Sequence, residues 1–155
     1  MRLPRWLTYT AIIKGGDSKL FRIRINPKYK EDKGLLAHEE EHVRQWYIFT
    51  LVSFVLSMGG LITYGGFDIH YSWWLMVLTY SSLGYNMLSM VSKKFRFFIE
   101  TKCYAAQIKK YSLKHREYYI KAFAKFLTEN YDLGITNEVA TAALRKELGG
   151  SPFGY

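Results

Sequence analysis

The chain has 155 residues, 49% of them hydrophobic and 17% aromatic, and it carries a formal net charge of +9 at pH 7. This length suits one domain with a single core, and the apolar content excludes an intrinsically disordered chain. The basic residues are spread along the sequence without a recognisable nucleic-acid-binding motif, so we expect no nucleic-acid partner. The single cysteine, Cys103, excludes a disulfide framework and a cluster of zinc-binding thiolates, so a zinc site would use histidine and carboxylate.

Two short segments near the N-terminus, Tyr9–Lys14 and Leu20–Ile25, are predicted to be strands. In the second segment apolar residues alternate with arginines, which is typical of a strand with one buried face. The residues between them, Gly15-Gly16-Asp17-Ser18, favour a turn, so we expect a β-hairpin. This hairpin would cover one side of the helix that follows, and its edge could also bind an extended peptide.

The most informative stretch is an HExxH motif formed by His38, Glu39 and His42. On a helix, residues four positions apart lie on one face, so both imidazoles can bind the same metal ion. The Glu39 carboxylate would reach a water molecule activated by the metal and act as a general base. Apolar neighbours such as Val43 and Trp46 indicate a buried helix, and a buried histidine pair needs a partner. A solvated helix with two incidental histidines is the alternative.

A long apolar segment follows, in which Asp68 is the single formally charged residue between Gln45 and Ser92. Its two runs, Trp46–Tyr64 and Tyr71–Val91, are each close to the length that crosses a bilayer. Basic residues flank both outer ends, so we expect a membrane hairpin with its ends and the metal site on the cytoplasmic side. The alternative is a helix pair buried in a soluble core, an oligomer or a particle. The flanking basic residues are Arg44, Lys93, Lys94 and Arg96, and the aromatic residues near the expected interfaces are Tyr47, Tyr64, Tyr71, Trp73 and Trp74.

The remainder of the chain is polar with helical apolar stripes. One helix is predicted from about Phe95 to Ile108, and a second runs to Asn130 after a cap at Ser112. Thr136 or Asn137 starts a last helix, which Gly149-Gly150 ends. The tail 151–155 is expected to be an extended surface segment. The predicted fold class is therefore α+β and mainly helical, with an N-terminal β-hairpin and a central apolar helical hairpin.

Two histidines do not complete a catalytic zinc site, which usually has three protein ligands and an open position. The downstream candidates are His70, Glu100 and His115. His70 would lie beyond the membrane, whereas Glu100 belongs to a helix that returns to the side of the metal. Phe98 and Ile99 precede Glu100 directly, so its carboxylate is expected to be buried and in need of a partner. We therefore prefer Glu100 as the third ligand.

The HExxH motif, followed by Glu100 on a later helix, resembles the gluzincin class of zinc metallopeptidases. The longer pattern Leu-Leu-Ala-His-Glu-x-x-His-Val-Arg-Gln-Trp, then Phe-Arg-x-x-Ile-Glu-x-x-x-Tyr-Ala-Ala-Gln, is similar to small zincin-like proteins common in phage genomes. The resemblance extends from Ile23 to Leu144. It implies a zincin-like core in which His38, His42 and Glu100 bind zinc and Glu39 is the base.

Two departures from the gluzincin pattern concern the helix of Glu100. Tyr104 stands where these enzymes commonly have an acidic residue, and Lys102-Cys103 replaces a second acid and an alanine. Tyr104 or His115 could instead donate a hydrogen bond to the oxyanion of the reaction.

We therefore expect one zincin-like domain over residues 1–155, with residues 46–92 inserted as a hairpin between two metal-binding helices. The expected function is a zinc-dependent metallopeptidase that acts on a peptide or protein and is associated with a membrane. The alternative is a zinc-stabilised structural or interaction protein without catalytic activity, such as a phage virion component. In either case residues 46–92 would contact the membrane or a virion protein.

Overall fold

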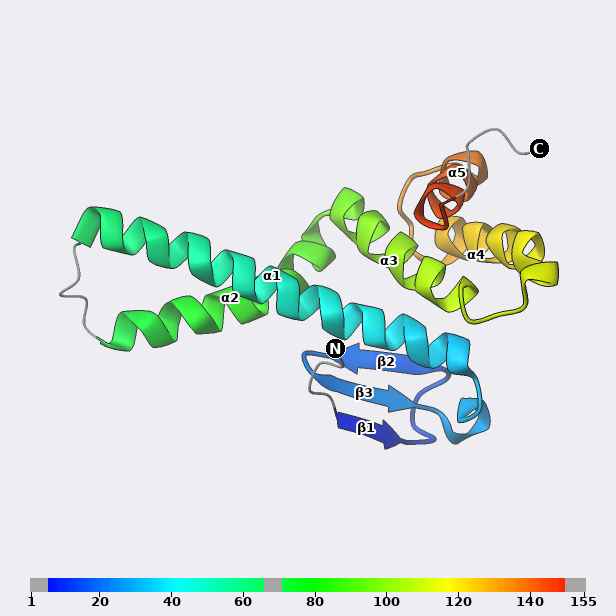
Figure 1. The fold of residues 1–155 in the computed structure, drawn as a ribbon, viewed down its shortest axis with the longest axis horizontal. Coiled ribbons are helices and arrows are strands. Elements are labelled where there is room, and N and C mark those ends of the chain that lie inside the picture. The colour runs from blue at the N-terminus through cyan, green and yellow to red at the C-terminus, as the bar shows by residue number, and fades with distance from the viewer. Residues whose placement is uncertain (1–5, 66–70, 150–155) are drawn as a thin grey trace.

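A computed structural model describes residues 6–65 and 71–149 of the chain, and Figure 1 shows its arrangement. The predicted fold class is confirmed, because helices dominate and one small sheet lies at the N-terminus. The loop 66–70 with His70 and the tail 151–155 lie outside the described residues, as do the side chains of Tyr64, Tyr71 and Trp74. The elements are β1 (Trp6–Tyr9), β2 (Gly16–Lys19), β3 (Arg22–Ile25), η1 (Pro27–Tyr29), α1 (Lys33–Gly65), α2 (Tyr71–Val91), α3 (Lys93–Ile108), η2 (Leu113–His115), α4 (Arg116–Asn130) and α5 (Asn137–Glu147).

The N-terminal sheet differs from the predicted hairpin in its strands and in their pairing. The predicted strand Tyr9–Lys14 is wrong, because β1 ends at Tyr9 and residues 10–14 are not a strand. The strand order is β1-β3-β2, with β2 antiparallel and β1 parallel to β3. The segment predicted as a turn therefore forms β2, and the actual hairpin turn is the pair Leu20-Phe21, where Leu20 has φ 55°. Asp17 pairs with Arg24 across the two strands, which shows why a polar, glycine-rich segment can serve as an edge strand. The predicted alternation in β3 is confirmed, since Ile23 and Ile25 are fully buried.

The N-terminal half of α1 packs along the sheet (Figure 1). Ile23 and Ile25 of β3 meet Val43 of α1 in a small core, so the alternating residues of the strand face the apolar stripe of the helix. Asp32 begins α1 by accepting a hydrogen bond from the Leu35 amide at 2.9 Å. This packing holds the HExxH segment against the sheet.

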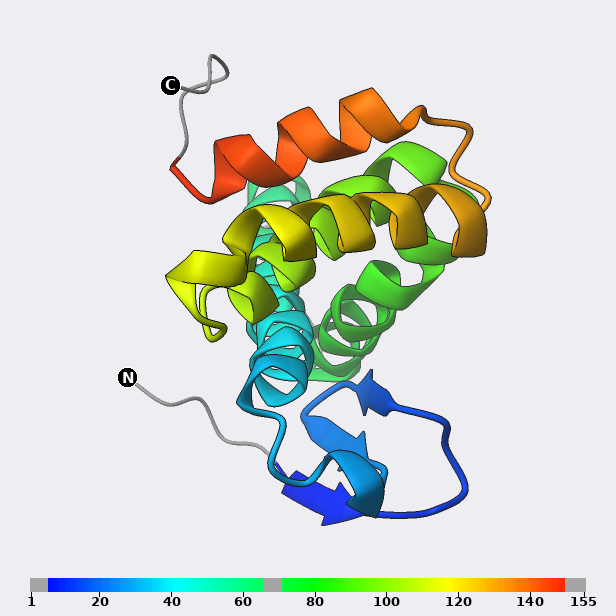
Figure 2. The same cartoon turned by 90° about the vertical axis from the view of Figure 1, so that its right-hand side faces the viewer.

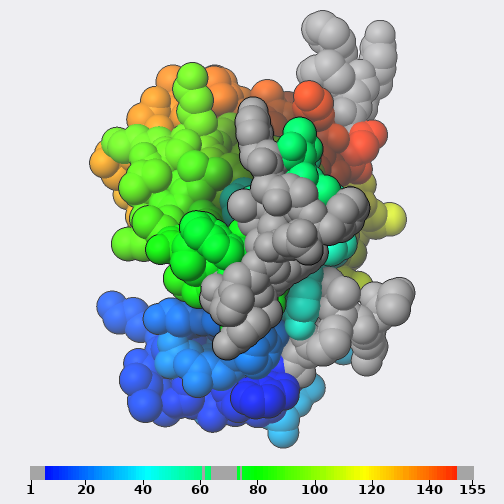
Figure 3. All heavy atoms as spheres, turned by 90° about the vertical axis from the view of Figure 1, so that its left-hand side faces the viewer, coloured from blue at the N-terminus to red at the C-terminus, as the bar shows by residue number. Residues whose placement is uncertain are grey.

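The predicted helical hairpin is present, but its first helix is not a separate element. α1 continues unbroken from the HExxH segment through the first apolar run, and α2 packs back against it. The outer part of this hairpin projects beyond the sheet and beyond α3–α5 (Figure 1). Figure 3 looks along the hairpin from its tip, with the sheet (blue) below it and the C-terminal helices above.

The hairpin packs closely at some positions but leaves many of its large apolar side chains exposed. Gly84 of α2 lies so near Phe49 of α1 that an added Cβ would come within 3.2 Å of its ring. Leu56 and Met87, by contrast, are 71% and 63% exposed. Within the part of the chain that the structure describes, no helix combines the length and apolarity of a membrane span. The membrane hairpin therefore stays a prediction.

The C-terminal helices form the largest core of the molecule. α3, α4 and α5 pack together, and α4 and α5 cover α3 on one side (Figure 2). The buried residues at their junction include Ile108, Ile120, Leu127 and Leu144. This core fixes α3, and with it the face of α3 that turns toward α1.

Helix ends in this region follow local sequence signals with one exception. Ser92 caps α3 by accepting from the Phe95 amide, and Thr136 caps α5 as expected. Gly149, with φ 76°, follows α5 in the left-handed conformation that ends helices. Ser112 does not cap a helix directly, because η2 intervenes and α4 begins at Arg116.

The C-terminal core yields a stability prediction. Leu144→Ala removes a fully buried side chain at the α3–α5 junction and should lower the free energy of unfolding by about 2–5 kcal/mol. Val139→Ala, on the same helix but 49% exposed, should change it by about 0.5 kcal/mol or less. Urea unfolding followed by circular dichroism measures both variants. Equal effects would show that α5 does not pack as described.

Candidate metal centre

Three side chains from two helices converge between α1 and α3. His38 and His42 lie one turn apart on α1, with ring centroids 5.0 Å from each other. Glu100 of α3 faces both rings, and its Oε2 atom is 3.7 Å from the Nε2 atom of each histidine. The structure therefore brings together the three residues that the sequence predicted as metal ligands.

This geometry fits a zinc ion. Tetrahedral zinc with nitrogen and oxygen ligands at about 2.0–2.1 Å places neighbouring ligand atoms about 3.3 Å apart. The 3.7 Å separations between Glu100 and each histidine exceed that value only slightly. Glu100 Oε2 is also buried without a hydrogen-bond partner, which is costly for an ionised oxygen. A cation between Oε2 and the two imidazoles would satisfy it.

The protonation states of the three proposed ligands differ. Burial, followed by the nearby His42, lowers the pKa of His38 to about 3, so its imidazole is neutral and has a lone pair to donate. Burial alone would raise the pKa of Glu100, but the facing imidazoles, His42 first, hold it below its ordinary value. Without a metal the site thus holds a neutral His38 and an ionised Glu100 at neutral pH. Burial alone would lower the pKa of His42, but the nearby Cys103 and Glu100 raise it well above its ordinary value, so a metal ion would have to displace the His42 proton.

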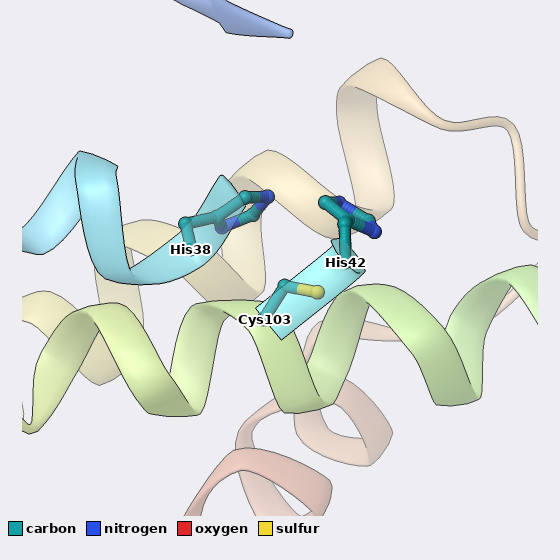
Figure 4. A group of neighbouring side chains, drawn as sticks. All are labelled: His38, His42 and Cys103. Carbon is teal, nitrogen blue, oxygen red and sulfur yellow. The ribbon is translucent and has the colours of Figure 1, made fainter. Parts of the chain in front are cut away.

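Cys103 lies close to the two histidines, although the sequence analysis did not propose it as a ligand. One ligand atom from each of His38, His42 and Cys103 lies within 4.8 Å of the others (Figure 4). Burial raises the pKa of the Cys103 thiol to about 11, so the thiol is protonated at neutral pH. Its spacing from Glu100, three positions along α3, is the signal that could have revealed it.

Cys103 lies behind the histidines. A cleft of about 460 Å³ opens beside the cluster, and its walls include His38, His42 and Glu100. Cys103 is not among the described residues that line this cleft. Its Sγ atom instead lies 3.5 Å from Nε2 of the buried Gln45 amide. A metal ion held by the two histidines and Glu100 would therefore keep one side open to the cleft.

Glu39 lies on the wall of the same cleft, against β2. Its carboxyl group interacts with Ser18, and an added Cβ on Gly16 would come within 2.5 Å of Glu39 Oε1. Burial raises the pKa of Glu39 to about 7, which suits a group that must both accept and release a proton near neutrality. The predicted base is thus beside the predicted ligands.

Tyr104 occupies a different position from the one that an oxyanion donor needs. Its ring packs against His38 with centroids 4.5 Å apart, and it is absent from the described cleft lining. Its hydroxyl is 3.2 Å from that of Tyr131, and Tyr131 does line the cleft together with Arg96. The Arg96 guanidinium lies over the Tyr131 ring at 5.0 Å. The sequence analysis did not name Tyr131 and named Arg96 only as a residue that flanks the apolar segment, because both are distant from the motif along the chain.

His115, the other candidate from the sequence, is an exposed residue of η2. Within the described part of the chain, it makes no contact with the cluster of His38, His42 and Glu100. His70 lies outside the described residues.

The chain matches no protein-family model, no curated protein and no solved structure at a significant level. The geometry of the cluster therefore carries the functional argument.

The contact between Gly16 and Glu39 yields a second prediction. In Gly16→Ala the new methyl group collides with the Glu39 side chain, so either β2 or the carboxylate must move. We expect the free energy of unfolding to fall by about 1–3 kcal/mol, as for other overpacked sites. Gly15→Ala is the matched control, because an added Cβ there meets nothing within 4 Å. Similar chemical denaturation curves for the two variants would contradict the packing of Glu39 on β2.

Proposed function

We propose that the protein is a zinc-dependent peptidase whose ligands are His38, His42 and Glu100 and whose general base is Glu39. The observation that carries the proposal is a buried His38 and a half-buried His42 that face a carboxylate oxygen without a hydrogen bond, with a second carboxyl group on the same cleft wall. A zinc ion held there would polarise water and a peptide carbonyl, which is the chemistry that peptide hydrolysis requires.

The chain's own residues supply the proton transfers. A Glu39 carboxylate oxygen would accept a proton from the attacking water and then deliver it to the nitrogen of the leaving amine. Tyr131 is better placed than Tyr104 to donate a hydrogen bond to the developing oxyanion, because its side chain lines the cleft. Tyr104 would then support Tyr131 through their hydroxyl contact.

A peptide substrate is favoured by the position of β2. Among the described residues, this strand is at the edge of the sheet, since it pairs only with β3. Gly16, Asp17 and Ser18 of β2 also line the cleft. An extended peptide could add to this edge by main-chain hydrogen bonds and lie alongside Glu39.

A structural zinc site is the second candidate, and Cys103 is the observation that favours it. If Cys103 lost its proton and joined the two histidines and Glu100, four protein ligands would close the site. The position of Cys103 outside the described cleft lining makes us prefer the catalytic arrangement.

The ligand set can be tested by metal analysis. Protein purified without chelators should contain about one zinc ion per chain, and Glu100→Ala should weaken zinc binding by at least about 10- to 100-fold. Cys103→Ser should bind zinc nearly as well as the unmodified protein, because the thiol is not required for coordination. His115→Ala is the control. If Cys103→Ser releases the metal and Glu100→Ala does not, the site is the structural one.

Catalysis can be tested separately through the base. Glu39→Gln keeps the size of the side chain but cannot accept the proton, so zinc content should remain while cleavage of a fluorogenic peptide library falls by at least about 100-fold. Glu41→Gln, two positions along α1 and paired with Arg44, is the matched control. Loss of zinc in Glu39→Gln would make Glu39 a ligand, and unchanged cleavage would remove its assigned role.

A further inference from the structure

A chain of hydrogen bonds runs from Gln107 of α3, next to His38, through Tyr111 to Asp32 at the start of α1. Because Nε2 of His38 faces Glu100, the nitrogen left for other contacts is Nδ1. Nδ1 is buried and has no hydrogen-bond partner among the described residues. The hydrogen-bonding side chain next to the His38 ring is Gln107 of α3, which is itself buried. Gln107 is thus the residue of α3 that can determine how this imidazole is held.

The orientation of the Gln107 amide follows from the groups beyond it. The Tyr111 hydroxyl lies 3.1 and 3.2 Å from the two carboxylate oxygens of Asp32. A carboxylate only accepts, so Tyr111 must donate to Asp32 and its oxygen must accept from Gln107 Nε2, 2.9 Å away. The amide nitrogen therefore faces Tyr111, and the carbonyl oxygen Oε1 at the other end of the amide is the atom that can accept from His38 Nδ1.

The far end of the chain of bonds is anchored at the start of α1. Asp32 Oδ1 also accepts from the Leu35 amide, so this carboxylate is fixed by the first turn of the helix that carries both histidines. Gly34 makes the arrangement sterically feasible, because any Cβ at this position would overlap the Tyr111 ring. The bonds therefore run from one end of α3 to the beginning of α1.

We propose that Gln107, held by Tyr111 and Asp32, is a positioning residue that keeps His38 as the tautomer with hydrogen on Nδ1. Nε2 then carries the lone pair and points at Glu100, as a zinc ligand must. This role rests on the proposed metal site, but the tautomer of His38 is a property of the metal-free protein. The two proposals can therefore fail separately.

The first measurement is the His38 tautomer in metal-free protein, from nitrogen-15 NMR of the imidazole. The unmodified protein should show hydrogen on Nδ1. Gln107→Leu removes the acceptor and should give a mixture of tautomers, whereas Gln107→Glu retains an acceptor oxygen and should restore the Nδ1–H form. The same Nδ1–H population in Gln107→Leu as in the unmodified protein would overturn the proposal.

The second measurement is zinc affinity, by competition with a chromogenic chelator. Gln107→Leu should bind zinc about 10- to 100-fold more weakly, in the range typical for groups that orient metal ligands. Tyr111→Phe keeps the ring but frees the amide to rotate, so it should weaken binding in the same direction by a smaller factor. Gln107→Glu should remain close to the unmodified protein.

Thr101→Val is the matched structural control. Thr101 is also a buried polar residue of α3, and its hydroxyl has no hydrogen-bond partner, so its replacement perturbs the helix without touching the chain of bonds. It should leave the tautomer and zinc affinity unchanged. If Gln107→Leu lowers only the unfolding midpoint, as a packing residue would, the positioning role is wrong. If zinc does not bind the unmodified protein but the tautomer shifts as expected, only the metal proposal is wrong.

Discussion

One buried carboxylate, Glu100, determines how the two central helices meet. An ionised carboxyl group without partners costs several kcal/mol to bury, so α3 can pack on α1 only in a register that places Glu100 opposite His38 and His42. Gln45 supports this register, because its buried amide reaches the Ile99 carbonyl of α3 and accepts from the hydroxyl of Tyr85 on α2. The contact between α1 and α3 is thus as much electrostatic as apolar.

The other elements hold this contact from two sides. The sheet packs on α1 through Ile23 and Ile25, and it brings β2 against Glu39 at the margin of the cleft. On the opposite side, α4 and α5 bury the outer face of α3 around Leu127 and Leu144. The outer hairpin contributes much less, since Met58 is its one buried large apolar side chain among the described residues beyond Trp46 on α1. The site and the C-terminal core therefore depend little on the far end of the hairpin.

Several features of the fold could be predicted from local sequence alone. The HExxH spacing predicts two imidazoles on one helical face, and the apolar runs predict a helical hairpin of nearly the observed extent. The caps at Ser92 and Thr136 mark the starts of α3 and α5, because a hydroxyl that accepts from a nearby amide is a local interaction. The pairing of the strands was not predictable in this way, since Gly16–Lys19 resembles a turn until Arg24 is available to Asp17.

The sequence by itself determined that His38, Glu39 and His42 lie close together, because they occupy fixed positions on one helix. It also identified Glu100 from its apolar neighbours. Only the tertiary structure placed Cys103, Gln107 and Tyr131 around these residues. It also showed that Tyr104 packs against the His38 ring and is not among the described residues that line the cleft. The physical reason is that helical periodicity fixes which residues share a face, whereas the packing of α3 on α1 decides what that face meets.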